Sequence, residues 1–199
     1  MASDFHTHYL PADHCRALLS TSDPQAGEFV SLEYHPWHLP ENFTVIPQDF
    51  PEKLAGFNAL GEIGLDKLHG ASPDIQLHCL EQLLQLAHEM NKPVVLHVVR
   101  CYQEIFALLK RFSLRVMVHG FCGSPELLDE LWKRDITVSF PVNALKKTAL
   151  MDKLTAPRGR FGFESDCNQN ISVNEIINKS MIPGVEKMTD QYFNDFLGI

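Results

Sequence analysis

The feature that most constrains the fold is the alternation of short apolar runs with longer amphipathic segments. Seven runs have the length and bounding residues of buried strands: residues 4–7, 28–33, 59–64, 93–97, 115–119, 135–140 and 160–164. Segments with helical spacing separate several of them, and helix starts are marked by Ser72-Pro73, Ser124-Pro125 and Ser172 with Glu175. Strands that alternate with helices imply right-handed βαβ units and a parallel sheet. The pattern predicts a single α/β domain over residues 1–199, either a barrel or an open sheet.

The net charge bears on which partners the protein can bind, and the cysteines bear on the cellular compartment in which it works. With 17 Lys and Arg against 25 Asp and Glu, the chain has a formal net charge of −8. This disfavours extensive binding to a nucleic-acid backbone, although divalent cations can bring positive charge to a nuclease site. The N-terminus lacks the features of a signal peptide, no apolar run is long enough for a membrane span, and the five cysteines are scattered. We therefore expect a cytoplasmic protein with free thiols and no membrane association.

Histidines and carboxylates recur at the carboxyl ends of the predicted strands. His6 and His8 alternate along the first strand, so their side chains share one face. Glu62 lies between glycines near the end of the third strand. Residues of the same kinds end later strands: His97, His119, Glu164 and Asp166. Since parallel sheets place their active sites at these ends, we expect these side chains to converge.

The joint pattern predicts a metal site, although a lone histidine at a strand end is more often a core residue. A carboxylate such as Glu62 after an apolar strand favours a functional role, because an unpaired buried charge is costly. Imidazole with carboxylate suits zinc, manganese, iron or nickel, and a larger carboxylate share suits magnesium. Two ions bridged by a carboxylate can stabilise the attacking and leaving oxygens of a phosphoryl transfer. The predicted chemistry is metal-assisted hydrolysis.

Six short motifs occur in a characteristic order along the chain. They are Asp-Phe-His-Thr-His, His-Pro-Trp, Gly-Glu-Ile-Gly-Leu-Asp, Pro-Val-Val-Leu-His, His-Gly-Phe-Cys-Gly-Ser and Glu-Ser-Asp. This order resembles that of TatD-type metal-dependent hydrolases, which belong to the amidohydrolase-like barrels. The resemblance runs from residue 4 to about residue 166, and Gly-Glu-Ile-Gly-Leu-Asp is its most specific part. It implies a TIM-barrel-like metal-dependent hydrolase fold and phosphodiester hydrolysis on DNA.

The same resemblance implies roles for individual residues around two divalent ions, either zinc, manganese or magnesium. One ion would be held by His6, His8, Glu62 and Asp166, and a second by Glu62, His97 and His119. Glu62 would bridge the ions, and Asp166 would also orient or deprotonate the attacking water. His35 and Arg100 would contact a substrate phosphate.

The chain also departs from the family pattern. Only residues 11–27 separate the first two predicted strands, where the family usually has a helix, a strand and another helix. One βα unit is therefore predicted to be missing, which leaves about seven parallel strands. The arginine at position 100 is shifted by one residue, and Asn168 stands where the family has a proline. The six predicted ligands remain, but the substrate groove is altered.

Three functions are compatible with these features. The leading hypothesis is a TatD-like deoxyribonuclease that acts on DNA or a nucleotide, as a monomer or homodimer. The second keeps the metal centre but hydrolyses a small phosphoester or an amide-like bond, which the negative net charge favours. The third is a metal-binding protein that has lost its activity.

Overall fold

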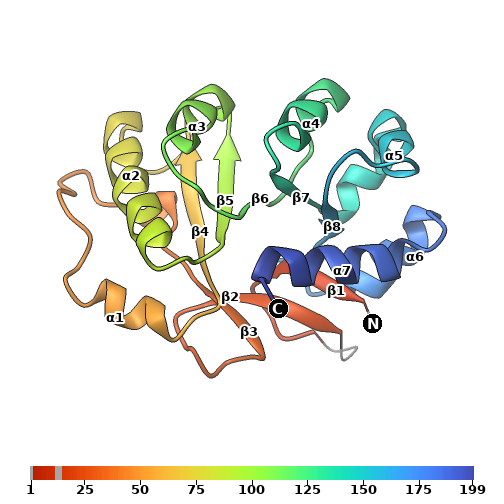
Figure 1. Cartoon of the computed structure of the whole chain (residues 1–199), viewed down its shortest axis with the longest axis horizontal. Helices are drawn as coiled ribbons and strands as arrows, with labels where there is room; N and C mark the ends of the chain where they lie inside the picture. Colours follow the sequence, from red (N-terminus) through yellow and green to blue (C-terminus); the bar gives the residue numbers. More distant parts are fainter. Residues whose placement is uncertain (1, 12–14) are drawn as a thin grey trace.

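The chain forms a closed barrel of parallel strands in a computed structural model that describes residues 2–11 and 15–199. The strands in this part of the chain are β1 (Ser3–Thr7), β2 (Arg16–Thr21), β3 (Phe29–Leu32), β4 (Ala59–Asp66), β5 (Val94–Val99), β6 (Val116–Val118), β7 (Thr137–Phe140) and β8 (Phe161–Phe163). Each pairs with its sequence neighbour, and β8 closes onto β1 where Phe163 lies beside Asp4. Figure 1 shows β4 and β5 side by side, with β1 and β3 below them. The predicted TIM-barrel-like fold is confirmed.

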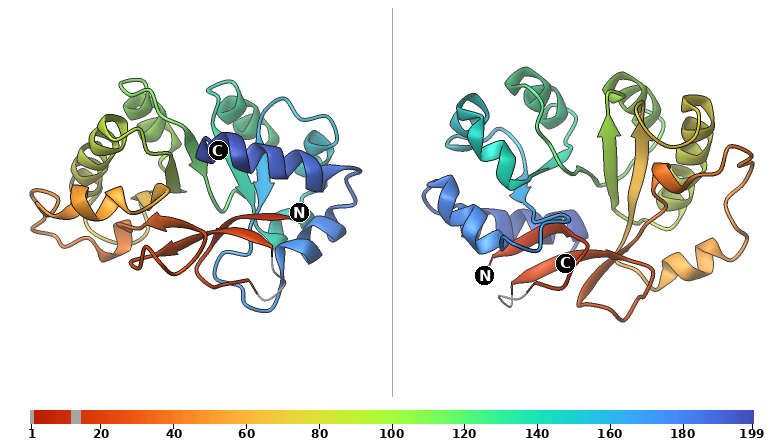
Figure 2. Two further views of the ribbon diagram at one scale, coloured as in Figure 1. Left: turned by 60° about the horizontal axis from the view of Figure 1, so that its bottom comes forward. Right: turned by 180° about the vertical axis from the view of Figure 1, so that it is seen from behind.

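Helices surround the barrel from β3 onward. They are η1 (Pro36–His38), α1 (Phe50–Ala55), α2 (Pro73–Glu89), α3 (Tyr102–Leu109), α4 (Pro125–Trp132), η2 (Val142–Lys146), α5 (Thr148–Leu154), α6 (Val173–Ser180) and α7 (Val185–Leu197). Ser124 and Ser172 cap α4 and α6, and each hydroxyl accepts a backbone N–H of the first turn. In Figure 2, α2 to α5 form an arc around the outside of the strands. Among the described helices, each is too short or too polar to cross a lipid bilayer.

The expectation of about seven strands is wrong. Residues 16–21, which lie in the segment 11–27 where no strand was predicted, form β2. This strand pairs with β3 from Leu18 opposite Phe29 to Thr21 opposite Leu32. Within the described residues, which exclude 12–14, no helix separates β1 from β2 or β2 from β3. What is missing on this side of the barrel is therefore the covering helices, whereas the strand is present. Because the ring of strands is closed, no sheet edge is exposed.

The C-terminal helix α7 packs against the interior residues below the strand ends. Val95 and Met117 each lie two residues before a histidine, so they share its side of the strand. Both belong to one buried cluster with Phe193 of α7. The fully buried Phe193 ring meets Phe5 of β1 edge to face, with centroids 5.4 Å apart, and Figure 1 shows α7 lying across β1. An apolar floor thus supports the polar residues at the strand ends.

Candidate metal centre

One buried carboxylate, that of Glu62 in β4, lies at the centre of the site. Its Oε1 lies 2.8 Å from His97 Nδ1 and 2.7 Å from His119 Nε2. Its Oε2 lies 3.2 Å from His6 Nε2 and 3.3 Å from His8 Nε2. Burial opposes ionisation, but the surrounding histidines, led by His119, hold the pKa of Glu62 well below its usual range. Glu62 is therefore an ionised carboxylate shared by two pairs of imidazoles.

Two glycines allow the Glu62 strand to approach β5 closely. Gly64 has a φ of +153°, and a Cβ at this position would overlap with the carbonyl oxygen of His97. Gly61, with a φ of +152°, faces Val95 in the same way. Side chains rarely adopt this conformation, whereas glycine does so readily. The Gly-Glu-Ile-Gly sequence thus brings Glu62 and His97 into contact across adjacent strands.

Asp166 joins the cluster because its backbone is bonded to the end of β1. Its N–H donates to the carbonyl of His6 at 3.0 Å, and its carbonyl accepts the N–H of His8 at 3.2 Å. Its φ of 53° is left-handed, a conformation that Asp tolerates better than most residues. Asp166 Oδ1 lies 3.7 Å from His6 Nε2 and 3.8 Å from His8 Nε2. With 38% of its side chain exposed, Asp166 lies beside the Oε2 half of Glu62 and is open to solvent.

These side chains form a cluster that can bind metal. Three groups have candidate ligand atoms within 4.8 Å of one another: His6, His8 and Asp166; His6, Glu62 and His119; and His35, Glu62 and His97. The His6 ring is fully buried, and its Nδ1 has no hydrogen-bond partner within the described chain, while its Nε2 lies 3.2 Å from Glu62 Oε2 without the alignment of a hydrogen bond. Leaving a buried polar atom unpaired is costly, and ligation of a divalent cation removes that cost. The donor set and the incompletely satisfied His6 imidazole therefore both fit a metal ion.

Two further buried carboxylates face the outer nitrogens of the histidines. Asp66 Oδ2 lies 3.2 Å from His97 Nε2, on the side of the ring away from Glu62. Glu164 Oε1 lies 3.7 Å from His119 Nδ1 and accepts a backbone N–H at 2.7 Å. Neither is among the predicted ligands. Asp66 could have been recognised, because it follows Glu62 by four residues on one strand and so shares its face.

The carboxylates give the site a strong preference for positive charge. A hydrogen bond with Glu62 raises the pKa of His8. Burial opposes charge on His119, but Glu62 and Glu164 raise the pKa of this imidazole well above its usual value. Protons and metal ions compete for such ligands, so the features that favour protonation here also favour a bound cation.

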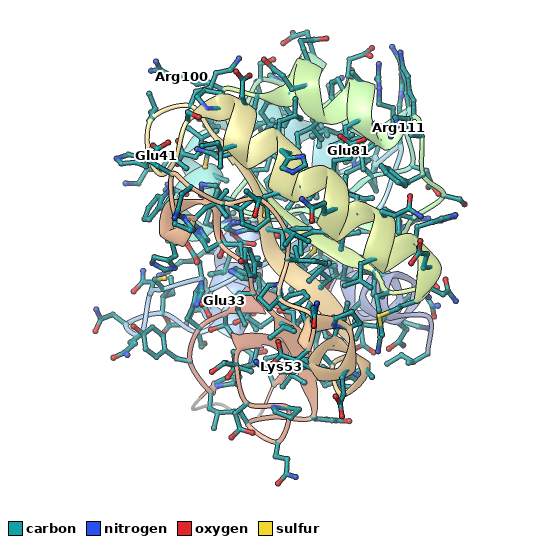
Figure 3. All side chains as sticks on the ribbon, turned by 90° about the vertical axis from the view of Figure 1, so that its left-hand side faces the viewer. Glu33, Glu41, Lys53, Glu81, Arg100 and Arg111 are labelled. Atoms are coloured by element: carbon teal, nitrogen blue, oxygen red, sulfur yellow. The ribbon has the colours of Figure 1, made fainter. Side chains whose placement is uncertain are left out.

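The two predicted substrate contacts lie in different places. His35 Nε2 is 3.0 Å from Glu62 Oε1, while its Nδ1 accepts the backbone N–H of Trp37 at 3.2 Å. Arg100 is exposed beyond the end of β5, with a left-handed φ of 59°. Figure 3 shows Arg100 at the upper margin of the molecule, apart from Glu33, whose Oε2 lies 4.0 Å from His8 Nδ1. The structure thus places His35 within the cluster and Arg100 outside it.

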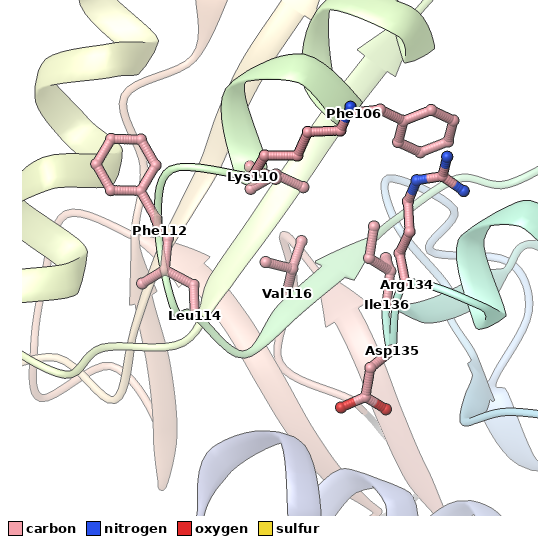
Figure 4. A pocket seen from close by; sticks show the side chains of 9 residues that line it. Phe106, Lys110, Phe112, Leu114, Val116, Arg134, Asp135 and Ile136 are labelled. Atoms are coloured by element: carbon pink, nitrogen blue, oxygen red, sulfur yellow. The ribbon is translucent and has the colours of Figure 1, made fainter.

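An apolar pocket of about 300 Å³ lies away from this cluster, between α3 and the segments that lead into β6 and β7 (Figure 4). Phe106, Leu114 and Val116 are among its lining residues. Val116 begins β6, whereas His119 follows the end of that strand. The pocket therefore lies toward the opposite end of the barrel and includes none of the predicted ligands.

Sequence comparisons find similarity to a family of DNases and to metal-dependent hydrolases. The profile of a family described as TatD related DNase matches residues 8–169. The uncharacterized metal-dependent hydrolase YabD of Bacillus subtilis is 32% identical over 118 residues, which are 55% of this chain and 46% of that protein. The deoxyribonuclease Tat-D of Schizosaccharomyces pombe is 34% identical over 79 residues, which are 37% of this chain and 24% of that protein. The matched part thus spans about half of YabD and about a quarter of Tat-D.

A structural comparison supports the fold over the whole chain. The crystal structure of YjjV, a TatD homologue from Escherichia coli, superposes with a TM-score of 0.73. The match covers 100% of this chain and 98% of that chain at 18% sequence identity. At this identity the likeness concerns the fold alone.

Proposed function

The chain belongs to the TatD-related DNase family, and from this premise we propose that it is a divalent-metal-dependent hydrolase that cleaves phosphodiester bonds in DNA. The observation that carries the proposal is the position of Glu62. Its two oxygens face different pairs of histidines, His97 with His119 and His6 with His8. This division supports two ions of zinc, manganese or magnesium, with Glu62 shared between them. Divalent cations held there would make a nucleophilic water available at neutral pH and stabilise charge on the phosphoryl oxygens.

The protein's own groups account for proton transfer and substrate orientation. Asp166 has 38% of its side chain exposed, so its Oδ1 can accept a proton from an incoming water, whereas Glu62 has only 4% exposed. Because His35 Nδ1 accepts the Trp37 N–H, its Nε2 carries the hydrogen and donates it to Glu62 Oε1 at 3.0 Å. If a metal ion occupied that oxygen, the same N–H would be available to a phosphate oxygen of the substrate. Arg100 lies outside the cluster, and we propose that it contacts a neighbouring phosphate of an oligonucleotide.

A small phosphoester is the second candidate substrate, and the charge of the protein favours it. The net charge is −8, and Glu33 and Asp166 place carboxylates beside the histidines. Affinity for a long anionic polymer depends on cationic side chains that neutralise phosphates. A compact substrate bound directly at the cluster requires fewer such contacts.

The proposal is tested by elemental analysis together with cleavage of 3′-labelled single-stranded DNA before and after chelation. We expect about two divalent ions per chain and shortening of the DNA that a chelator abolishes. Glu62→Gln keeps the shape of the side chain but removes the shared charge. Its cleavage rate should fall more than about 100-fold, because loss of partners outside the ligand set alone costs about 10- to 100-fold.

Glu81→Gln is the matched control, since Glu81 is a surface carboxylate of α2 paired with Arg111 (Figure 3). This variant should retain native metal content and cleavage. Activity retained by Glu62→Gln would contradict the role of Glu62. Native protein that binds metal and hydrolyses a phosphomonoester, but leaves the oligonucleotide intact, would support the small-substrate candidate instead.

A further inference from the structure

Trp37 of η1 is both exposed and held in one position. It is 49% exposed, yet its Nε1 donates to Oδ2 of the buried Asp66 at 2.6 Å. The other oxygen of Asp66 accepts the backbone N–H groups of Leu68 at 2.7 Å and His69 at 3.2 Å. A smaller donor could bond to Asp66 equally well. The exposed part of the indole therefore has no evident role in folding.

The loop between β4 and α2 supports the Trp37 backbone and one side of its ring. Gly70 has a φ of +86°, and a Cβ there would overlap with the carbonyl oxygen of Pro36. The missing side chain lets the loop lie directly against the Pro36–Trp37 backbone. The His69 ring lies tilted against the indole, with centroids 5.1 Å apart. These contacts restrict the orientation of the indole before any ligand binds.

The indole also lies next to the candidate metal centre. Its centroid is 5.7 Å from that of His97 and 5.0 Å from that of His35, and both contacts are edge to face. Asp66 Oδ2 contacts the indole and the His97 ring together. A phosphate bound at the cluster would therefore place the remainder of its nucleotide within reach of Trp37.

We propose that the exposed part of Trp37 is a stacking platform for the nucleobase adjacent to the scissile phosphate. This inference rests on the proposed function and refines its substrate to a single-stranded or frayed end of an oligodeoxynucleotide, because a base inside a duplex is already stacked on its neighbours. Every base offers a π face, so the platform accepts all four bases. A ring fixed in advance also lowers the entropic cost of binding.

The first test compares two single-stranded oligonucleotides, one with a normal terminal nucleotide and one with a tetrahydrofuran abasic residue at the 3′ or 5′ end. Trp37→Ala should lower kcat/KM on the normal oligonucleotide by about tenfold or more, since base stacking on an aromatic ring commonly contributes this much. Trp37→Phe keeps an aromatic face and should retain most of the rate. On the abasic oligonucleotide the two variants should be alike, because both lose the Nε1 hydrogen bond to Asp66 and neither has a base to stack on.

Met181→Ala, which removes an 87% exposed side chain after α6, is the control and should match the native protein. A different result is expected if Trp37 only holds Asp66 in place. Trp37→Phe loses the Nε1 hydrogen bond as Trp37→Ala does, so both would then lose activity equally on both oligonucleotides. That outcome would overturn the proposal that Trp37 stacks on a base.

The second test measures binding without catalysis. The chain has two tryptophans, and Trp132 is buried with its Nε1 bonded to the Arg160 carbonyl, so Trp132→Phe leaves Trp37 as the sole indole. In magnesium-loaded Trp132→Phe, a deoxynucleoside monophosphate should quench the fluorescence, whereas deoxyribose 5-phosphate should not. Quenching without DNA cleavage would support base stacking on Trp37 and refute the proposed function. Cleavage without quenching would refute only the stacking proposal. If neither quenching nor cleavage occurred, both proposals would be refuted.

Discussion

At the scale of single residues, Asp66 connects the candidate metal centre to the surface beside it. Its Oδ2 lies 3.2 Å from His97 Nε2 and accepts the Trp37 Nε1–H at 2.6 Å. Burial opposes its ionisation, but the hydrogen bonds from Trp37 and the Leu68 N–H hold the pKa of Asp66 below its usual range. An ionised Asp66 accepts a hydrogen bond from His97 and so favours the tautomer of this ring that carries its hydrogen on Nε2. The lone pair of Nδ1 is then directed toward Glu62, as ligation by that atom requires.

Asp66→Asn should weaken metal binding while the fold is preserved. Replacement of such an orienting carboxylate typically lowers metal affinity by about 10- to 100-fold, because the histidine loses its preferred tautomer and orientation. Competitive titration against a chromophoric chelator measures this change. Asp74→Asn, in the exposed first turn of α2, removes the same charge and should leave the affinity within about twofold. Equal affinities for Asp66→Asn and native protein would show that Asp66 does not orient His97.

At the scale of secondary structure, the sequence predicts the strands that carry or precede the predicted ligands better than it predicts β2. Glu62, His97 and His119 each follow a clear apolar run, so their meeting at one end of a parallel sheet could be expected. In β2, Ala17, Leu18 and Leu19 are good helix formers by intrinsic propensity. Parallel neighbours also normally require a long crossover, and the segments that flank β2 are short. Pairing with β1 and β3 determines its conformation.

Local sequence also gave no basis for the position of Arg100. Arg100 follows the last residue of β5 and has a left-handed φ of 59°. This backbone conformation, and not the spacing from His97, determines where the side chain points. The orienting contact of Asp66 with His97 likewise depends on the distance between two strands that glycines allow to approach. Features of this kind arise from tertiary packing, which a single sequence does not reveal directly.

The helix α7 illustrates how an element remote from the predicted ligands supports the barrel. Phe193→Ala should lower the free energy of unfolding by about 3–5 kcal/mol, the usual cost of removing a buried aromatic ring. Phe193 is fully buried and its ring contacts Phe5 and Phe29 edge to face. Urea unfolding followed by circular dichroism measures the change. Ile199→Ala, at an exposed position near the end of the same helix, should change stability by less than about 0.5 kcal/mol. A loss below 1 kcal/mol for Phe193→Ala would argue against its supporting role.

At the scale of the whole molecule, the candidate metal centre can assemble only when the barrel is closed. His6 and His8 come from the end of β1, Glu62 from β4, and Asp166 follows β8. In an unfolded chain these groups are far apart, except for the His6–His8 pair. A divalent ion should therefore bind the folded state much more tightly than the unfolded state, and metal binding should be linked to stability.

This linkage predicts the effect of metal on thermal unfolding. For one site, a metal concentration about 100 times the dissociation constant stabilises the folded state by about 2.7 kcal/mol. In a protein of this size that corresponds to a rise in Tm of roughly 5–10 °C. Scanning calorimetry with magnesium or manganese, against potassium chloride of equal ionic strength, separates ligation from screening. Glu62→Gln should abolish the rise because both histidine pairs lose their shared anion. An equal rise in Glu62→Gln would mean that the stabilising ions bind elsewhere on the protein.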